Sequence, residues 1–396
     1  MATSEITQTL IKFADAPPAD LSSEERLAFM AACEKAKLAV ENPLEATLRF
    51  MLGGLESVAL RLGVDMKLLD LGVESQGPIT ADQLASGSGA DVVLVVRIMR
   101  MLVAMALFKE VGHHTYLANP LAGAWVTGSP LREGVLHLSA QLPPIVFLPE
   151  YLEEKGYHNP TDAEDGPFQF ARQSHLHFFE WLSKKPRIQN AFNTTMSISR
   201  SQRGQEWFEI YPVEEKLRLS NPDASAILLV DIGGNVGHDL INFQKKFPDL
   251  PGRLVFEDLP GVVAAAGDLP KGIEGVGHDF FQPLPPALRN AKAYYLRQIL
   301  HDWPDKQARQ ILENVREAMA NGSILLINET IMPDDNVALY QAELDMLMMG
   351  VLASLDRTAG QLEELLDSAG FRLVGSWKPK DFVPGSGTLF EAVLKG

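Results

Sequence analysis

The sequence predicts an α/β protein, in which a mostly helical, winged-helix-like N-terminal domain precedes a parallel β-sheet with helices on both faces. Two observations predict this class. In the first 125 residues, apolar positions recur at helical spacing behind helix-capping sequences. From residue 226 onward, short continuous apolar runs alternate with amphipathic helices, as is typical of parallel strands. We therefore expect a helical domain over 1–125, connecting helices over 126–215 and a sheet domain over 216–396.

Capping sequences mark the helices of the first domain. Asn42 begins a helix whose apolar residues continue at helical spacing to residue 62, and Asp91 can cap an apolar helix over 92–108. A strand, a turn and a second strand predicted over 109–117 complete the outline of a winged helix. Because the segment that would read DNA is apolar and not basic, we favour dimerisation over DNA binding for this domain.

The second half of the chain contains the predicted sheet. Its buried strands are predicted at 227–230, 253–256, near Gly275, at 293–296 and at 323–327. A closing strand over 389–394 is expected to lie antiparallel at the edge of the sheet.

The composition excludes several classes of protein. Of the 396 residues, 46% are hydrophobic and 22% are charged, which is the composition of a globular protein and not of a disordered one. The 51 acidic residues outnumber the 35 basic ones, for a formal net charge of −16. Nucleic acids and anionic lipids are both bound by clustered Lys and Arg, so we expect neither as a partner.

A single cysteine, Cys33, excludes an intramolecular disulfide and zinc sites built from several thiolates. The first residues lack the layout of a signal peptide. The most apolar run, 92–108, is interrupted by Arg97 and Arg100 and is shorter than the roughly 20 residues that cross a bilayer. We therefore expect a cytoplasmic protein.

A glycine-rich turn follows the first predicted strand. Asp231 ends this strand, Gly233 and Gly234 allow a tight turn that a ligand can approach closely, and Asp258 ends the next strand. A carboxylate at the end of the second strand can bind the vicinal hydroxyls of a ribose. The turn therefore predicts a ligand that contains a nucleoside.

Acidic residues narrow the choice of nucleoside. Asp231 would repel a pyrophosphate but suits a cationic ligand, and S-adenosylmethionine carries an ammonium and a sulfonium beside its ribose. Asp279 can accept a hydrogen bond from the exocyclic amine of adenine, and Phe280 can pack on its ring. The alternatives are structural: Asp231 as a helix N-cap, and Asp279 as a turn residue beside core aromatics.

His301 follows the strand at 293–296, so it belongs to the edge of the sheet where ligands bind. A neutral imidazole can take the proton of a phenol, whose pKa is roughly 10. Glu329, after the next strand, and Asp356 are candidates for the carboxylate that orients this base. The alternative is a histidine at a helix start. The other histidines lack metal-ligand spacing, so we expect no metal.

These motifs together resemble the plant- and fungal-type S-adenosylmethionine-dependent O-methyltransferases that act on phenolic small molecules without a metal. The resemblance spans most of the chain and is strongest over 230–370. The matching stretches are Val-Asp-Ile-Gly-Gly at 230–234, Asp-Leu-Pro at 258–260, His-Asp-Phe-Phe at 278–281, Leu-His-Asp-Trp-Pro-Asp at 300–305, Arg-Thr at 357–358 and Ala-Gly-Phe at 369–371.

The resemblance implies a Rossmann-like methyltransferase sheet, a homodimer formed by the N-terminal domains, and roles for individual residues. It implies that His301 is the general base, flanked by Glu329 and Asp356, and that Phe192 and Met196 clamp an aromatic substrate. The cofactor-binding positions that the motifs and the resemblance indicate are Asp231, Gly233, Gly234, Asp258, Asp279, Phe280, Arg297 and Trp303.

Two residues depart from the family pattern. Asn235 replaces the third glycine of the turn, and asparagine tolerates a positive φ better than most residues. Asp356 stands where the family has a glutamate, and its side chain is shorter by one methylene. The shorter side chain raises the question of whether Asp356 reaches His301.

The sequence therefore predicts an O-methyltransferase of fungal-type secondary metabolism that methylates a phenolic or polyketide-like hydroxyl directly, with His301 as base. The alternative is a methyltransferase-fold pericyclase or dehydratase, in which S-adenosylmethionine is an unspent cation that stabilises a polarised transition state. A DNA-binding regulator is disfavoured by the charge of −16, and a nicotinamide dehydrogenase is disfavoured by Asp231.

Overall fold

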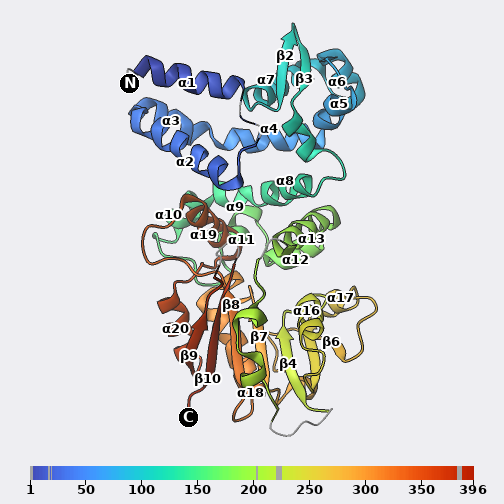
Figure 1. Ribbon diagram of the computed structural model, residues 1–396, viewed down its shortest axis with the longest axis vertical. Coiled ribbons are helices and arrows are strands. Elements are labelled where there is room, and N and C mark those ends of the chain that lie inside the picture. Colours follow the sequence, from blue (N-terminus) through green and yellow to red (C-terminus); the bar gives the residue numbers. More distant parts are fainter. Residues whose placement is uncertain (1–2, 17, 19, 202–203, 220–224, 381–385) are drawn as a thin grey trace. The chain divides into compact units, whose positions relative to one another are not determined.

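The computed structural model describes residues 3–16, 18, 20–201, 204–219, 225–380 and 386–396. Its contacts divide the chain into two compact units, Met1–Asn119 and Pro120–Gly396, which are described separately (Figure 1). Among the described residues, no helix is both long enough and apolar enough to span a bilayer.

The N-terminal unit is helical with one small sheet, as predicted. The predicted caps at Asn42 and Asp91 are confirmed: their side chains accept hydrogen bonds from the backbone amides of the first helical turn. The sheet is antiparallel in the order β1-β3-β2. The elements are α1 (Thr3–Asp15), α2 (Ser23–Val40), α3 (Pro43–Leu52), α4 (Gly54–Asp65), α5 (Leu68–Glu74), β1 (Ile79–Thr80), α6 (Ala81–Ser88), α7 (Val92–Ala104), β2 (Phe108–Gly112) and β3 (Thr115–Ala118).

Two helices of this unit end earlier than predicted. The helix that begins after Asn42 is interrupted at Gly53 and continues as α4. The helix after Asp91 ends at Ala104, because the chain turns with a positive φ of 58° at Ala106 and then enters β2. The apolar residues of α3 are largely exposed: Leu44 at 68% and Met51 at 77%. This face therefore lacks cover within the described part of the N-terminal unit.

The C-terminal unit begins with short helices that gather, together with α19, beyond one end of the sheet (Figure 1). Within this group, α8 packs closely on α13, and α19 packs on α9 and α11. The helices of this group are η1 (Pro120–Trp125), α8 (Pro130–Ala140), α9 (Leu142–Val146), α10 (Leu148–Glu154), α11 (Pro167–Arg172), α12 (Phe178–Ser183), α13 (Pro186–Ser201) and α19 (Leu339–Leu352).

The sheet has seven strands in the order β6-β5-β4-β7-β8-β10-β9. The first five in this order pair in parallel, and β10 pairs antiparallel with both of its neighbours. The strands are β4 (Ile227–Ile232), β5 (Arg253–Asp258), β6 (Ile273–Gly277), β7 (Ala293–Arg297), β8 (Ile324–Glu329), β9 (Phe371–Trp377) and β10 (Thr388–Leu394).

The prediction that the closing strand lies at the edge is wrong. The strand is antiparallel as predicted, but β10 lies between β8 and β9, and β9 forms the edge. Every second residue of β9 is exposed, so its sequence lacks the continuous apolar run by which the other strands were predicted. By contrast, the first five residues of β10, Thr388–Ala392, are buried.

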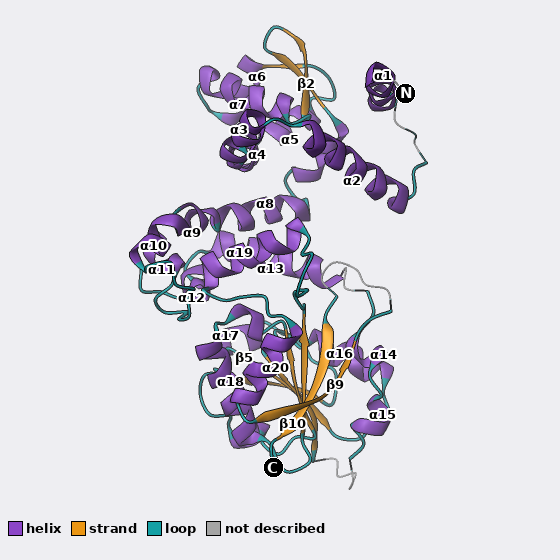
Figure 2. Cartoon of the chain, turned by 90° about the vertical axis from the view of Figure 1, so that its left-hand side faces the viewer, coloured by secondary structure: helices purple, strands orange, loops and turns teal. Residues whose placement is uncertain are grey.

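Helices cover both faces of the sheet, which confirms the predicted α/β class (Figure 2). One face packs on α18 (Asp305–Ala318) and α20 (Ala359–Ser368), whose leucines and isoleucines join Val230, Tyr294 and Leu325 in one core. The opposite face packs on α14 (Trp207–Ile210), α15 (Val213–Lys216) and α16 (His238–Lys246). The carboxyl ends of β4 to β8 thus share one edge, where ligands bind in such folds.

Candidate active site

The turn after β4 has the backbone that its glycines and asparagine predicted. Gly233, Asn235 and Gly237 all have positive φ, of 68°, 58° and 80°. A Cβ on Gly233 would lie 2.4 Å from Cδ1 of Ile299, and a Cβ on Gly234 would lie 2.8 Å from Oδ2 of Asp231. Residues 233 and 234 must therefore be glycine for the chain to turn this closely.

Asp231 is buried within β4, with 3% of its surface exposed. Burial raises the pKa of Asp231 well above its usual value, and the charge of Asp239 adds to this effect. Arg297 lies on the neighbouring strand β7, and its Nη1 is 3.3 Å from Oδ2 of Asp239 and 3.9 Å from Oε2 of Glu206. A buried acid of this kind is favourable for a ligand with a positive charge.

Two acids end β5. Asp258 accepts hydrogen bonds from the amides of Asn235 and Leu259, each at 2.8 Å, and burial raises its pKa. Glu257, which the sequence analysis did not single out, is fully buried and accepts a bond of 3.2 Å from the amide of Gly233. Burial raises the pKa of Glu257 to about 8, and its Oε1 has no hydrogen-bond partner among the described residues.

The Asp279 turn leads into a group of aromatic rings. Oδ1 of Asp279 accepts a hydrogen bond from the amide of Phe281 at 3.0 Å, so the residue also serves as the turn aspartate of the structural alternative. The Phe280 and Phe281 rings lie 6.1 and 4.6 Å from that of Trp303, both edge-on. Trp303 is thus packed against the loop that contains Asp279.

His301 lies in the short helix η3 (Leu300–Asp302) and contacts two carboxylates. Its Nδ1 is 3.5 Å from Oδ1 of Asp356, and its Nε2 is 3.4 Å from Oδ1 of Asp302. The shorter side chain of Asp356 therefore does reach the imidazole. Burial lowers the pKa of His301, but Asp302, Asp356 and Glu329 outweigh it and raise this pKa to about 10.

Glu329 and Arg357 hold the backbone around His301. Oε1 of Glu329 accepts hydrogen bonds from the amides of Ile299 and Leu300, at 3.1 and 2.9 Å. Glu329 acts on the imidazole through its charge, whereas Asp302 and Asp356 lie against the ring nitrogens. The buried Arg357 donates to the carbonyl oxygens of Leu300 and Trp303, at 2.6 and 2.7 Å.

The sequence analysis quoted Asp302 and Arg357 only as letters of motifs. Both are adjacent to residues that it did select, His301 and Asp356, and this adjacency is the signal that could have found them. Glu257 was also missed, and its position beside Asp258 is again the signal that could have found it. Arg357 and Glu257 contact residues that are distant in the sequence, which no local pattern contains, whereas Asp302 contacts its neighbour His301.

Phe192 and Met196 lie one turn apart on α13. The Phe192 ring meets His137 of α8 edge-on at 5.1 Å and Phe179 of α12 at 6.1 Å. Met196 is 42% exposed. The Phe179 ring is in turn 6.2 Å from that of Trp303. A continuous series of aromatic rings therefore links α8 and α13 to the His301 segment.

The chemistry of this edge fits S-adenosylmethionine. Asp231, Glu257, Asp258 and Asp279 come from the ends of three neighbouring strands and offer acceptors for an ammonium group, ribose hydroxyls and an exocyclic amine. Burial raises the pKa of Asp231 even with Arg297 on the neighbouring strand, and Oε1 of Glu257 has no hydrogen-bond donor among the described residues, so this edge suits a ligand that carries positive charge and N–H or O–H donors. S-adenosylmethionine supplies both the positive charge and the donors.

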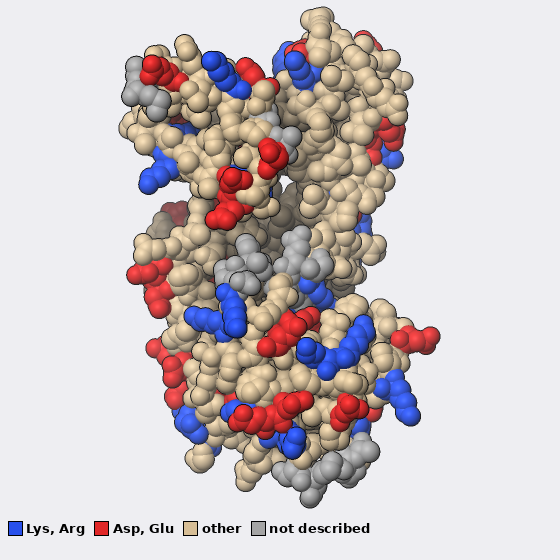
Figure 3. All heavy atoms as spheres, in the orientation of Figure 1, with Lys and Arg blue, Asp and Glu red and all other residues tan. Residues whose placement is uncertain are grey.

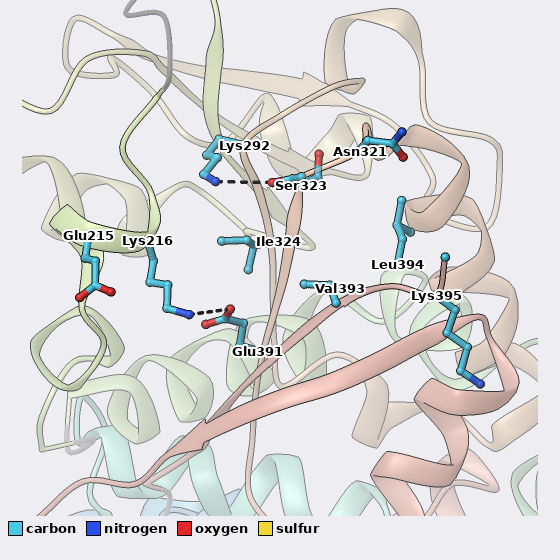
Figure 4. A pocket seen from close by; sticks show the side chains of 12 residues that line it. Glu215, Lys216, Lys292, Asn321, Ser323, Ile324, Glu391, Val393, Leu394 and Lys395 are labelled. Carbon is cyan, nitrogen blue, oxygen red and sulfur yellow. Dashed lines mark hydrogen bonds and ion pairs between the residues drawn. The ribbon is translucent and has the colours of Figure 1, made fainter.

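A hollow of about 700 Å³ lies elsewhere, at the opposite edge of the sheet (Figure 4). Three of its charged side chains already have partners: Lys216 pairs with Glu391 at 3.1 Å, and Lys292 donates to the carbonyl oxygen of Gly322. On the face drawn in Figure 3, acidic and basic side chains are interspersed over the C-terminal unit. Neither feature competes with the acidic edge as the candidate site.

The sheet, its glycine turn and the acids at its edge define an enzyme class that binds a nucleoside cofactor at the carboxyl ends of parallel strands. Residues 163–372 match the family model of the O-methyltransferase domain, and residues 48–128 match that of the O-methyltransferase dimerisation domain. The first match spans more than half of the chain, which therefore belongs to the O-methyltransferase family. The protein is an S-adenosylmethionine-dependent methyltransferase.

Individual relatives and solved structures are similar over most of the chain. The chain is 33% identical over 332 residues to demethylsterigmatocystin 6-O-methyltransferase of Aspergillus parasiticus, with 84% of each chain covered. It is similar to a solved structure described as a pericyclic reaction enzyme, at 28% identity and a TM-score of 0.78 with 99% of each chain covered. It is also similar to LepI in complex with S-adenosylmethionine, at 27% identity and a TM-score of 0.80 over the full length of both chains.

Proposed function

We propose that this methyltransferase methylates a phenolic hydroxyl of a small molecule in fungal-type secondary metabolism, with His301 as the general base. One observation carries the proposal: an imidazole lies between Asp302 and Asp356 at the sheet edge that also holds the acids suited to the cofactor. Proton removal and methyl transfer require these groups to lie side by side.

S-adenosylmethionine, when bound, supplies a methyl group on a positively charged sulfur. His301, in its neutral form, accepts the proton of the acceptor hydroxyl at Nε2. Asp356 faces Nδ1, which fixes the ring orientation and stabilises the imidazolium that forms. Asp302 lies 3.4 Å from Nε2, so the acceptor hydroxyl must take its place beside this nitrogen. Glu329 and Arg357 keep the η3 backbone in position.

The remaining site residues receive roles in cofactor and acceptor binding. Asp231, Gly233, Gly234 and Arg297 surround the methionine portion, and Asp258 binds the ribose. Asp279, Phe280 and Trp303 hold the adenine. Phe192 and Met196 line the acceptor side. The acids at three strand ends support the roles in cofactor binding, and the aromatic series from His137 to Trp303 supports the roles in acceptor binding.

The acceptor class follows from the lining of the site. An aromatic, polyketide-like phenol suits the edge-on rings of Phe192 and Phe179, which offer an apolar wall. A relative that acts on demethylsterigmatocystin is consistent with this class. We further propose a cytoplasmic homodimer assembled through the N-terminal domain of residues 1–125, whose α3 face is exposed in the single chain.

The direct test is product analysis. Candidate phenolic and polyketide acceptors are incubated with methyl-labelled S-adenosylmethionine and the enzyme, and the products are resolved by mass spectrometry. We expect a labelled product that is heavier by one methylene unit, and one S-adenosylhomocysteine per product. Transfer of label to carbon or nitrogen, or transfer at the wild-type rate by His301→Ala, would contradict the proposal.

A second candidate function is a pericyclic or dehydration reaction in which S-adenosylmethionine is not consumed. The observation that favours it is the full-length similarity to a pericyclic reaction enzyme. The same incubation separates the two candidates, because this reaction yields an isomer or a dehydrated product while the cofactor stays intact. The base between two carboxylates favours methylation.

A further inference from the structure

His177 has a tautomer that the structure fixes. The residue caps the N-terminus of α12, where its Nδ1 accepts a hydrogen bond from the amide of Phe179 at 3.4 Å. Burial lowers the pKa of His177 to about 4, so the ring is neutral at physiological pH. A neutral imidazole that accepts at Nδ1 has its proton on Nε2. Nε2 is therefore a donor.

This donor has no partner. Nε2 of His177 is inaccessible to solvent and makes no hydrogen bond to any described residue. Buried polar groups in folded proteins almost always find a partner, because leaving one unpaired is costly. A missing partner beside a binding site points to a ligand atom with a free lone pair.

The position of the ring indicates which ligand. The imidazole stacks on Trp303 with ring centroids 4.6 Å apart and planes 18° apart. Trp303 in turn lies against Phe280 and Phe281, in the loop that also contains Asp279. Phe280 is also near the glycine turn, because a Cβ on Gly233 would approach it to 3.7 Å. The ring of His177 thus belongs to the purine side of the proposed cofactor site.

We propose that His177 donates a hydrogen bond from Nε2 to a ring nitrogen of the cofactor's adenine. This inference rests on the proposed cofactor site. The carboxylates of that site accept hydrogen bonds, so Asp279 can bind the exocyclic amine but not the lone pair of a ring nitrogen. His177 supplies the missing donor and makes the site selective for purines whose ring nitrogens are intact. An oxygen of the phenolic acceptor offers the same kind of lone pair, and the experiment separates these two sources.

The test measures binding of S-adenosylhomocysteine and of its 1-deaza, 3-deaza and 7-deaza analogues by calorimetry, with the full-length protein. His177→Phe keeps the stack on Trp303 but removes both nitrogens, and His177→Asn keeps an N-cap side chain but not the Nε2 donor. We expect each variant to bind S-adenosylhomocysteine about 5- to 10-fold more weakly, as for the loss of one neutral hydrogen bond. His175→Phe, an exposed histidine two residues away, is the matched control and should bind like wild type.

The analogues distinguish a hydrogen bond from a general loss of structure. Wild type should bind one deaza analogue about 5- to 10-fold more weakly than S-adenosylhomocysteine, and His177→Phe should bind these two ligands equally. If His177→Phe loses the same fraction of its affinity for S-adenosylhomocysteine and for every deaza analogue, His177 has a structural role and the inference is overturned. Wild-type affinity in both variants with only the KM of the acceptor changed would also overturn it, because this result would assign the donor to the acceptor. Failure of wild type to bind S-adenosylhomocysteine would instead contradict the cofactor site itself.

Discussion

The proposed cofactor side and the proposed acceptor side of the site are built in different ways. On the cofactor side, Asp231, Asp258 and Asp279 lie at or just beyond the ends of neighbouring parallel strands, so the sheet alone brings them together. On the acceptor side, Phe179 and Phe192 come from two successive helices, α12 and α13, and an aromatic contact joins them. Backbone hydrogen bonds of the sheet therefore position the residues of the proposed cofactor side, whereas side-chain packing positions those of the proposed acceptor side.

His301 belongs to the boundary between these two sides, and its removal gives the largest expected effect. His301→Ala should lower kcat for methyl transfer by about a thousandfold, because a general base contributes roughly 10² to 10⁴ in rate. The affinity for S-adenosylhomocysteine should change less than about twofold, since the acids of the cofactor side are untouched. Steady-state kinetics and calorimetry check both values, with His158→Ala as a matched control in an exposed loop.

Arg357 tests whether the segment around His301 depends on a residue that is distant in the sequence. Arg357→Gln removes the bonds to the carbonyl oxygens of Leu300 and Trp303 inside the core, so the free energy of unfolding should fall by about 3 kcal/mol. Urea denaturation measures this change. The exposed Arg309→Gln on α18 should unfold like wild type. Equal stability of the two variants would show that Arg357 is dispensable.

Asp258 tests the cofactor side alone. Asp258→Asn should weaken binding of S-adenosylhomocysteine by about 10- to 100-fold, because hydrogen bonds to a charged carboxylate contribute roughly 1.5 to 3 kcal/mol. The KM of the acceptor, measured at saturating cofactor, should stay close to that of wild type. A change in the KM of the acceptor, with unchanged affinity for S-adenosylhomocysteine, would contradict the assignment of Asp258 to the cofactor.

The pH dependence of kcat/KM tests the assignment of His301 as the base. With the pKa of His301 at about 10, most molecules hold a protonated imidazole at neutral pH, and only the neutral form accepts a proton. The value of kcat/KM should therefore rise about tenfold per pH unit between pH 7 and 9. Asp302→Asn removes a nearby negative charge and should move the midpoint to lower pH. A pH-independent rate over this range would contradict the assignment of His301.

The smallest effects belong to the acceptor wall. Phe192→Ala should raise the KM of the acceptor about tenfold through lost aromatic contact, and Met196→Ala about threefold, because Met196 is already 42% exposed. Neither variant should alter the affinity for S-adenosylhomocysteine. Kinetics at saturating cofactor, with calorimetry as the control, give both values. A loss of cofactor affinity would contradict the assignment of Phe192 and Met196 to the acceptor alone.

The same division explains what could be predicted from sequence. The strands, the glycine turn and the acids at their ends were predictable, because each lies within a few residues of a buried apolar run. Asn235 even has the positive φ expected of its position. The environment of His177 was not predictable, because Trp303, which covers its ring, is far away in sequence. The edge strand β9 was missed, since a half-exposed strand gives no continuous apolar signal.

The two bonds from Arg357 also bear on the order in which a nascent chain acquires activity. The ribosome releases the cofactor acids and His301 well before it makes Asp356 and Arg357. Until that late stretch has emerged and docked, the carbonyl oxygens of Leu300 and Trp303 lack the guanidinium that binds both of them in the folded protein. A chain that stops before residue 356 therefore lacks both the carboxylate beside Nδ1 of His301 and the guanidinium that holds its loop.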